Sequence, residues 1–319
     1  MSESDPFSHL RSDFETYYNN KLWPKLFAIE EKRIKYLHRF WVLFIIVGMW
    51  LPALLLWVGG EWLRHIFTEG SSKDVEGVLK LGALIASVII AIVSSPIVSY
   101  KLAVKDTIIN DFINFFGDFR HSLTRQILDA TIKKSLLLNN YNRHDTDDYF
   151  YGTYKNVSMV ISEEKMIRKG NKNQSTVFKG IMVLLKFPKS FSGRTVVFKD
   201  WGHLNFLHTT DKNFERVALE DVVFEKEFEV YGTDQIEARF LLTTAFMERM
   251  LHVRETFKGR KIQFSFFDNQ LLIAIDTSKD MFEPASLFKS STDRRPVNDV
   301  LEQFISIFAI VEFLKLTQQ

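Results

Sequence analysis

The sequence predicts an α+β soluble domain that is anchored by two transmembrane helices and joined to them by amphipathic helical arms. Two long uncharged stretches lie before residue 101, apolar residues recur at helical spacing beside them, and strand-like alternation follows residue 140. The expected segments are an N-terminal arm at 1–39, a transmembrane helix at 40–60, a short external loop at 61–80, a second transmembrane helix at 81–100, a helical stalk at 101–140 and the α+β domain at 141–319.

The composition excludes several classes of protein. The net charge is +2, close to balance, so binding to nucleic acid is not expected. The chain contains no cysteine, which excludes disulfides, thiol nucleophiles and cysteine-bound metal sites. This composition fits a reducing compartment.

The two uncharged stretches are each long enough to cross a bilayer. Phe40–Gly60 and Leu81–Tyr100 contain no Asp, Glu, Lys or Arg. A helix of about 20 residues rises roughly 30 Å, which matches the hydrocarbon core. Pro52 and Pro96 do not argue against this, because transmembrane helices tolerate proline. We therefore expect a two-helix hairpin in the membrane.

Basic residues near the helix ends predict the orientation of this hairpin. They flank the start of the first stretch and the end of the second: Lys32, Arg33, Lys35, Arg39, Lys101 and Lys105. The connecting loop offers Arg64 and Lys73 against a larger number of acidic residues. Because cytoplasmic flanks carry the excess of Lys and Arg, both termini are predicted to be cytoplasmic.

The second stretch carries small residues at every fourth position: Ala83, Ser87, Ala91 and Ser95. Such a face lets another helix approach closely inside a membrane. The favoured interpretation is packing against the first helix of the same chain. The alternative is a seam between chains in a homo-oligomer.

An apolar stripe follows the second stretch and predicts a helical stalk. Its members alternate steps of three and four residues: Ile109, Phe112, Phe116, Phe119 and Leu123. We expect this helix to pack on the N-terminal arm. A helix lying on the membrane surface is the alternative, favoured by the phenylalanines and by Lys133 and Lys134.

The remaining elements follow from local patterns. Residues 139–148 are predicted to be a linker, and strands are expected at Tyr149–Ile161, Val177–Phe187, Thr195–Phe198 and Phe224–Tyr231. Asp234 with Glu237 has the spacing of a capping box, and Thr243 can cap the next helix. A hairpin is expected at Lys261–Phe267 and Leu271–Asp276, and a final amphipathic helix at about 297–316.

Several motifs of the domain resemble those of a known family. They are Phe178-Lys179-Gly180-Ile181, Asp200, Phe224–Tyr231, Asp234–Arg239, Phe246–Met250 and Phe282-Glu283. Over roughly residues 145–290 the chain resembles the bacterial membrane protein family called domain of unknown function 3137. Thr244 departs from the proline expected after the capping Thr243.

The resemblance implies a protein of the bacterial inner (cytoplasmic) membrane, and it implies no activity or cofactor. The genes of the family often lie near those of LemA-type membrane proteins, which makes a LemA-type protein a weakly indicated partner.

Two polar motifs are candidate sites. His144 lies beside Asp145, Asp147 and Asp148, a set that suits a divalent cation, although a solvated linker is the favoured interpretation. The basic run Lys165, Arg168, Lys169 and Lys172 suits contact with anionic lipid headgroups. For this run a solvated hairpin turn is favoured.

The spacing of His203 and His208 does not match a metal-binding pair, so ordinary histidines are expected there.

No catalytic, metal-binding or nucleotide-binding motif stands out. The leading hypothesis is a membrane-anchored cytoplasmic interaction or scaffold module. The alternative is an uncatalogued enzyme acting at the cytoplasmic membrane surface. A deep pocket with converging titratable groups would favour the enzyme.

Overall fold

The computed structural model describes residues 7–69, 72–170, 173–199, 214–257, 260–277 and 279–316, with backbone alone at 51–75, 78–79 and 106. The chain forms two compact units. The helical unit comprises Leu10–Ile109 and Pro284–Val297. The α+β unit comprises Met1–His9, Asn110–Glu283 and Asn298–Gln319. The predicted α+β class is therefore confirmed.

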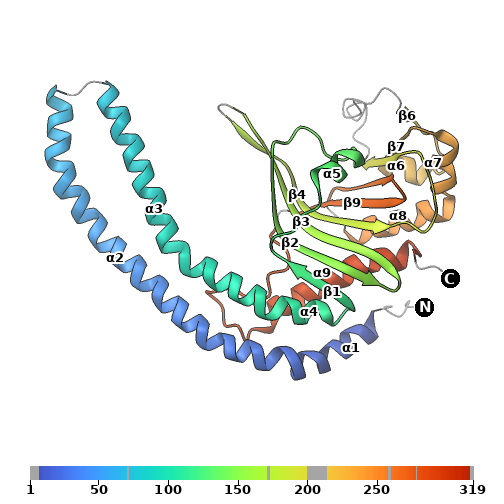
Figure 1. The fold of residues 1–319 in the computed structure, drawn as a ribbon, viewed down its shortest axis with the longest axis horizontal. Coiled ribbons are helices and arrows are strands. Elements are labelled where there is room, and N and C mark those ends of the chain that lie inside the picture. The colour runs from blue at the N-terminus through green and yellow to red at the C-terminus, as the bar shows by residue number, and fades with distance from the viewer. Residues whose placement is uncertain are drawn as a thin grey trace. The chain divides into compact units, whose positions relative to one another are not determined.

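The helical unit is dominated by two long neighbouring helices (Figure 1). Its elements in chain order are α1 (Ser8–Tyr17), the π-helical turn η1 (Tyr18–Leu22), α2 (Trp23–Glu69), α3 (Ser72–Val104) and η2 (Lys105–Ile109). The stretch 40–60 lies inside α2 and 81–100 lies inside α3. Much of the loop expected at 61–80 is helical, because α2 continues to Glu69 and α3 begins at Ser72.

One helical segment among the described residues, Lys80–Asn114, is long and apolar enough to cross a membrane. Only 6% of its most apolar part is buried. The side chains of 51–75, which include the second half of the 40–60 stretch, lie outside the described residues.

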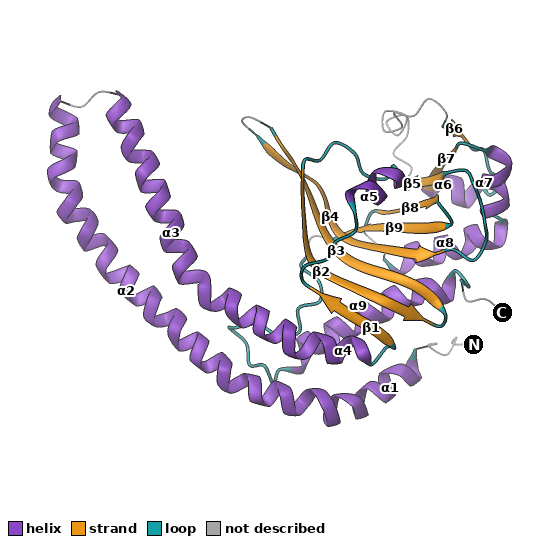
Figure 2. Ribbon diagram, in the orientation of Figure 1, coloured by secondary structure: helices purple, strands orange, loops and turns teal. Residues whose placement is uncertain are grey.

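The α+β unit is built on one nine-stranded antiparallel sheet (Figure 2). The strand order is β1-β2-β3-β4-β9-β8-β5-β7-β6. The strands are β1 (Asp118–Ser122), β2 (Arg143–Tyr154), β3 (Val157–Lys169), β4 (Gln174–Lys186), β5 (Thr195–Lys199), β6 (Glu215–Arg216), β7 (Phe228–Gly232), β8 (Ile262–Phe267) and β9 (Gln270–Asp276).

Tight turns set the two regular hairpins of this sheet. Asp268 and Asn269 adopt positive φ of 49° and 56° between β8 and β9, as the predicted hairpin requires. Lys155 and Asn156, with φ of 46° and 65°, likewise reverse the chain between β2 and β3. The single strand expected at Tyr149–Ile161 is therefore wrong, since the chain turns back in its middle.

Helices cover both faces of the sheet. The helix α9 (Arg294–Phe313) places Phe304 5.1 Å from the ring of Phe150 and Phe308 4.5 Å from that of Tyr154. A second buried cluster joins Ile132 of α5 (Asp129–Ser135) to sheet residues such as Met182. The predicted final helix is confirmed.

The shorter helices follow their caps. They are α4 (Asn110–Asn114), α6 (Val222–Glu227), α7 (Gln235–Leu241) and α8 (Thr244–Thr256). Asp234 accepts hydrogen bonds from the backbone N–H groups of Ile236 and Glu237, and Thr243 accepts one from Phe246, so both predicted caps are confirmed. Asp221 caps α6, which replaces the first half of the strand expected at Phe224–Tyr231.

The prediction of one helix across 101–140 is wrong. The helix ends at Asn114, Gly117 follows with φ of 141°, and Phe119 lies in β1. The aromatic stripe is buried in the α+β unit, where the Phe116 ring lies 4.9 Å from that of Phe308. An a/d pattern does not specify which surface it covers, and here that surface includes α9.

Candidate functional site

A β-bulge in β2 gathers acidic side chains on one side of the sheet. Thr146 pairs with Glu164 and Tyr149 with Ser162, so Asp147 and Asp148 together oppose the single residue Glu163. The linker predicted at 139–148 is therefore wrong from Arg143 onward, where the polar sequence forms a strand. A bulge accommodates polar residues that strict alternation would place on opposite faces.

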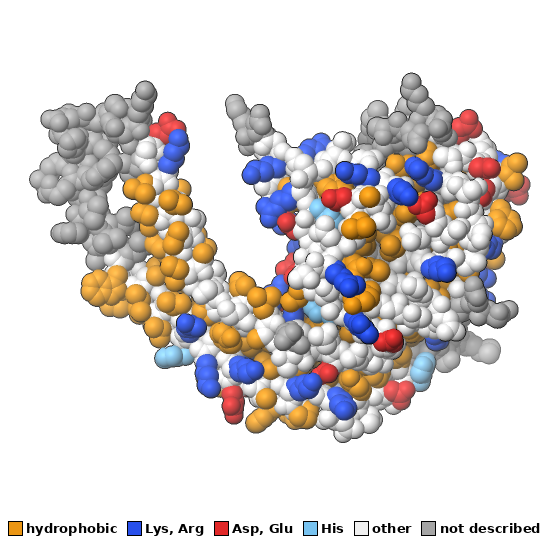
Figure 3. Space-filling model, viewed as in Figure 1, with side chains coloured by type: hydrophobic (Ala, Val, Ile, Leu, Met, Phe, Trp, Pro, Cys, Tyr) orange, Lys and Arg blue, Asp and Glu red, His pale blue; other side chains and the backbone are white. Residues whose placement is uncertain are grey.

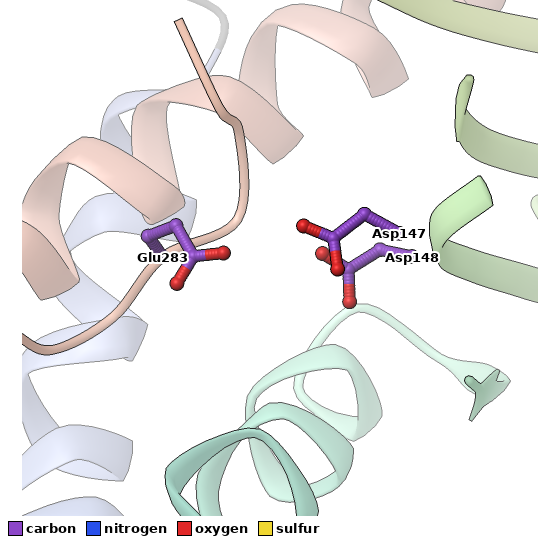
Figure 4. A group of neighbouring side chains, drawn as sticks. All are labelled: Asp147, Asp148 and Glu283. Atoms are coloured by element: carbon purple, nitrogen blue, oxygen red, sulfur yellow. The ribbon is translucent and has the colours of Figure 1, made fainter. Parts of the chain in front are cut away.

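Asp147, Asp148 and Glu283 approach one another at this bulge (Figure 4). Each offers one oxygen, and these atoms lie within 4.8 Å of one another. Carboxylate oxygens are the ligands that Ca²⁺ and Mg²⁺ prefer, so these residues could hold a divalent cation. The buried His121 ring contacts Asp148 at 2.7 Å and stabilises its charge within the fold, which is a structural role for the same carboxylate.

Glu163 lies at the centre of the acidic group. Its side chain is buried, and both of its oxygens accept from the backbone N–H of Met281. Burial, reinforced by the nearby charges of Asp147 and Asp148, raises the pKa of Glu163 to about 8. A cavity of about 230 Å³, the acidic pocket, is lined by Glu163, Asp147 and Asp280, with Lys179 at its edge.

A second polar network centres on Glu164, which is fully buried. His144 contacts it at 2.7 Å, Thr146 donates to it at 2.5 Å, and Ser162 donates at 2.7 Å. Burial alone lowers the pKa of His144, but its hydrogen bonds to Glu164 and Asp129 raise that pKa overall. These bonds satisfy a charge that would otherwise be costly to bury.

A larger cavity lies beside β4, β9 and β8. These strands are neighbours and run antiparallel, so the middle of β4 near Gly180, the end of β9 and the start of β8 lie side by side. The cavity measures about 580 Å³ and is here called the cationic cleft; its charged lining residues are Lys179, Arg260, Lys261, Lys279 and Asp276. Gly180 allows β4 and β9 to approach here, since a Cβ would lie 2.0 Å from the carbonyl oxygen of Ile275.

An ion pair separates the acidic pocket from the cationic cleft. Lys179 donates to Asp280 at 2.7 Å, and Lys179 lines both cavities. Opposite charges are thus divided between two adjoining hollows of one unit. Each hollow therefore favours a ligand of the opposite charge.

Of the residues predicted from sequence, Asp145, Asp147 and Lys165 line the acidic pocket, Asp148 lies beside Asp147 and Glu283, and His144 contacts Glu164. Lys165, Arg168 and Lys169 are exposed on β3, and Lys and Arg side chains gather over the β3–β4 hairpin (Figure 3). Lys172, Asp200, His203 and His208 lie outside the described residues. The face formed by Ala83, Ser87, Ala91 and Ser95 is exposed on α3, and Ser87 donates to its own helix at Leu84 O.

The sequence analysis missed the residues of the cationic cleft and the two buried glutamates of the acidic pocket. Lys179, Arg260 and Lys279 are far apart in sequence, and only strand pairing brings them together. Glu163 and Glu164 lie just beyond the expected strand Tyr149–Ile161, and they form no known motif. Two consecutive acidic residues inside an apolar strand were the available indication of a buried polar site.

The fold and its cavities define a nine-stranded antiparallel α+β domain attached to a long helical pair. Residues 176–316 match the model of the family described as "Protein of unknown function (DUF3137)". The resemblance stated from the sequence is confirmed.

No curated protein matches the chain. Among solved structures, the chain is similar to the mycobacterial trehalose monomycolate transport factor A, TtfA. That structure is 9% identical, covers 63% of this chain and 91% of its own, and gives a TM-score of 0.33. The likeness is too low to support an argument about function.

Proposed function

We propose that the protein is a membrane-tethered interaction module in which the α2–α3 hairpin crosses a bilayer and the α+β unit binds cytoplasmic partners. The observation that carries the tether is the exposed apolar surface of α3. Its exposed members are Leu81, Leu84, Ile85, Val88, Ile90, Ile92 and Val98. Exposing such a surface to water is costly at about 25 cal/mol per Å², whereas lipid chains solvate it.

The described part of α2 has matching properties. Phe44, Ile45, Ile46, Met49 and Trp50 are also exposed, and Ile90 of α3 is 67% exposed. Trp41 lies at the start of this apolar stretch, the depth that indole rings prefer. Two neighbouring helices with apolar outer surfaces support a hairpin that spans the membrane twice.

The β3–β4 hairpin is proposed to contact anionic headgroups through Lys165, Arg168, Lys169 and Lys172. The described three are exposed, and the hairpin extends past the neighbouring strands (Figure 1). Each cation close to an anionic surface contributes about 1 kcal/mol.

The same proposal includes association with other membrane helices. The small-residue face of α3 is exposed, which leaves it accessible to another helix. A second copy of this chain is the partner that we propose for this face, and a LemA-type protein remains the partner implied by the family resemblance.

Labelling of introduced cysteines tests the tether, and the natural chain contributes no background because it lacks cysteine. Gly77→Cys, near the start of α3, is expected to react with a membrane-impermeant maleimide on intact spheroplasts. Ser175→Cys, exposed on β4, is expected to react only after lysis. Equal protection of both positions, or release of the chain by alkaline carbonate, would reject the two-pass topology.

Partner binding is tested by purification in mild detergent. The full chain is expected to co-purify with a second copy of itself or with a defined partner. Ala91→Leu in the exposed face is expected to reduce self-association. Recovery of a lone monomer under all gentle conditions would count against the module.

An enzyme at the membrane surface is the second candidate, favoured by Glu163. A buried carboxyl whose pKa lies near 8 can serve as a general acid or base near neutral pH. Its hydrogen bonds from Met281, however, also hold the loop before α9. Turnover of ester and phosphoester substrates that is lost in Glu163→Gln, while the variant stays folded, would favour the enzyme over the module.

A further inference from the structure

Cations of three neighbouring strands converge on the cationic cleft. Lys179 belongs to β4, Lys261 precedes β8, and Lys279 follows β9. The strands are fixed in register there, since Asp276 N donates to Lys261 O and Thr277 N donates to Lys179 O, each at 2.9 Å. The convergence is therefore a property of the sheet rather than of mobile side chains alone.

The charges of the cleft are not balanced internally. Lys179 pairs with Asp280, and Lys261 faces Asp276. Arg260 and Lys279 are exposed and make no ion pair with any described residue. With Lys179 and Lys261 each facing a carboxylate, Arg260 and Lys279 leave the cleft with two unmatched positive charges.

Burial strengthens the electrostatic interactions of Lys261 with its charged neighbours. Burial lowers the pKa of Lys261, Asp276 opposes that change, and Lys199 adds to it. Lys199 is therefore a further cation near the cleft. A bound anion would stabilise the charged form of Lys261 and relieve this repulsion.

From this geometry we propose that the cationic cleft binds a small organic ligand that carries at least two phosphate groups. A single carboxylate would leave half of the unmatched positive charge uncompensated, whereas each phosphate brings about −1.5 to −2 charges and several acceptor oxygens. Arg260 can hold one phosphate with two parallel hydrogen bonds. Lys179 and Lys279 supply point charges for the other.

The size and polarity of the cleft define the rest of the ligand. A volume of about 580 Å³ exceeds the needs of a bare phosphate and lies in the range of small-molecule sites. Thr176 and Thr277 add hydroxyl groups to the lining, and Asp276 adds an acceptor for a hydroxyl of the ligand. A sugar, nucleoside or glycerol body fits this lining better than an apolar one.

The inference does not depend on the membrane tether, because all of the lining residues lie in the α+β unit. It also differs from the proposed headgroup contact of the β3–β4 hairpin, whose residues do not line the cleft.

Calorimetric titration of the full chain in neutral detergent with inorganic pyrophosphate tests the site. One saturable site is expected, and Arg260→Gln and Lys279→Gln should each weaken binding about tenfold. Lys186→Gln, an exposed lysine at the other end of β4, is the matched control and should bind as the natural chain does. Absence of saturable binding, or equal affinity in all variants, would overturn the proposal.

Competition against pyrophosphate distinguishes the sources of the ligand. Displacement by ATP supports a soluble ligand, and displacement by monomeric dihexanoyl phosphatidylinositol 4-phosphate, which carries two phosphate groups, supports a lipid headgroup. Displacement by neither rejects an organic ligand. Unchanged melting temperatures of the unliganded variants confirm that lost binding reflects the cleft and not the fold.

Discussion

The helices α3 and α9 are both long and apolar, yet they use their apolar side chains in opposite ways. In α9, Phe304 and Phe308 are buried within the α+β unit. In α3, Ile90 and Leu84 are 67% and 61% exposed. The apolar residues of α9 form one stripe, which a sheet can cover, whereas the uncharged sequence of α3 from Leu81 to Tyr100 is apolar or small all around the helix. The difference teaches that the distribution of apolar residues around a helix, more than their number, indicates what covers it.

The largest expected effect tests the buried helix. Phe304→Ala should lower the free energy of unfolding of the α+β unit by about 3–5 kcal/mol, because the ring is fully buried against Phe150 and Phe282. Urea unfolding in detergent, followed by pulse proteolysis of the α+β unit, measures this. Ile90→Ala should leave the same transition unchanged, and an equal loss in both variants would break the comparison.

A slightly smaller effect tests the exposed helix. Ile90→Lys should disfavour membrane insertion by about 3 kcal/mol, since a charge at the centre of a bilayer-spanning helix is costly. The fraction of chain retained in carbonate-washed membranes measures this, with Ile90→Leu as the control. Full retention of the lysine variant would show that lipid does not surround this part of α3.

The acidic pocket gives a further test of the buried interior of the α+β unit, because its stability is expected to depend on pH through Glu163. Folding raises the pKa of Glu163 from 4.5 to about 8, so the folded state holds this proton more tightly than the unfolded state does. The stability that this provides is complete below pH 4.5 and is lost as the pH rises through about 8, by at most about 1.4 kcal/mol per pH unit.

Glu163→Gln should therefore flatten the decline in unfolding free energy between pH 5 and about 8. Thermal unfolding across this range measures the effect. A decline that is equally steep in the variant would mean that another group is responsible.

The smallest effect concerns the β3–β4 hairpin. Lys169→Gln should weaken binding of the chain's α+β unit to an anionic surface by about 1 kcal/mol. Protection of Ser175→Cys from labelling in nanodiscs with and without anionic lipid measures this, and Lys186→Gln is the control at the far end of β4. If the protection of the introduced cysteine is the same with and without anionic lipid, the proposed headgroup contact of the β3–β4 hairpin is wrong.

Local patterns predicted the elements that depend on local physics. The cap of Asp234, the turn of Asp268 and Asn269 and the buried face of α9 each need only neighbouring residues, and each was predicted. The turn at Lys155 and Asn156 was missed because this pair offers a weaker turn preference than Asn-Gly or Asp-Gly.

The cavities could not be predicted because they depend on strand order. Lys179 and Lys261 are brought together by the insertion of β9 between β4 and β8. The acidic sequence at Asp147 and Asp148 indicated a solvated linker by composition, and only pairing with β3 makes it a bulge. A polar stretch that is satisfied by tertiary contacts resembles a loop when only its sequence is known.

The two edge strands of the sheet affect how copies of the chain can associate with one another. The sheet ends in β1, with 5 residues, and β6, with 2 residues. Short edges offer few free backbone groups to a neighbouring molecule. Under the proposed membrane tether, the chains would diffuse in two dimensions and meet often, and short sheet edges would let many copies crowd together without pairing strand to strand into fibres.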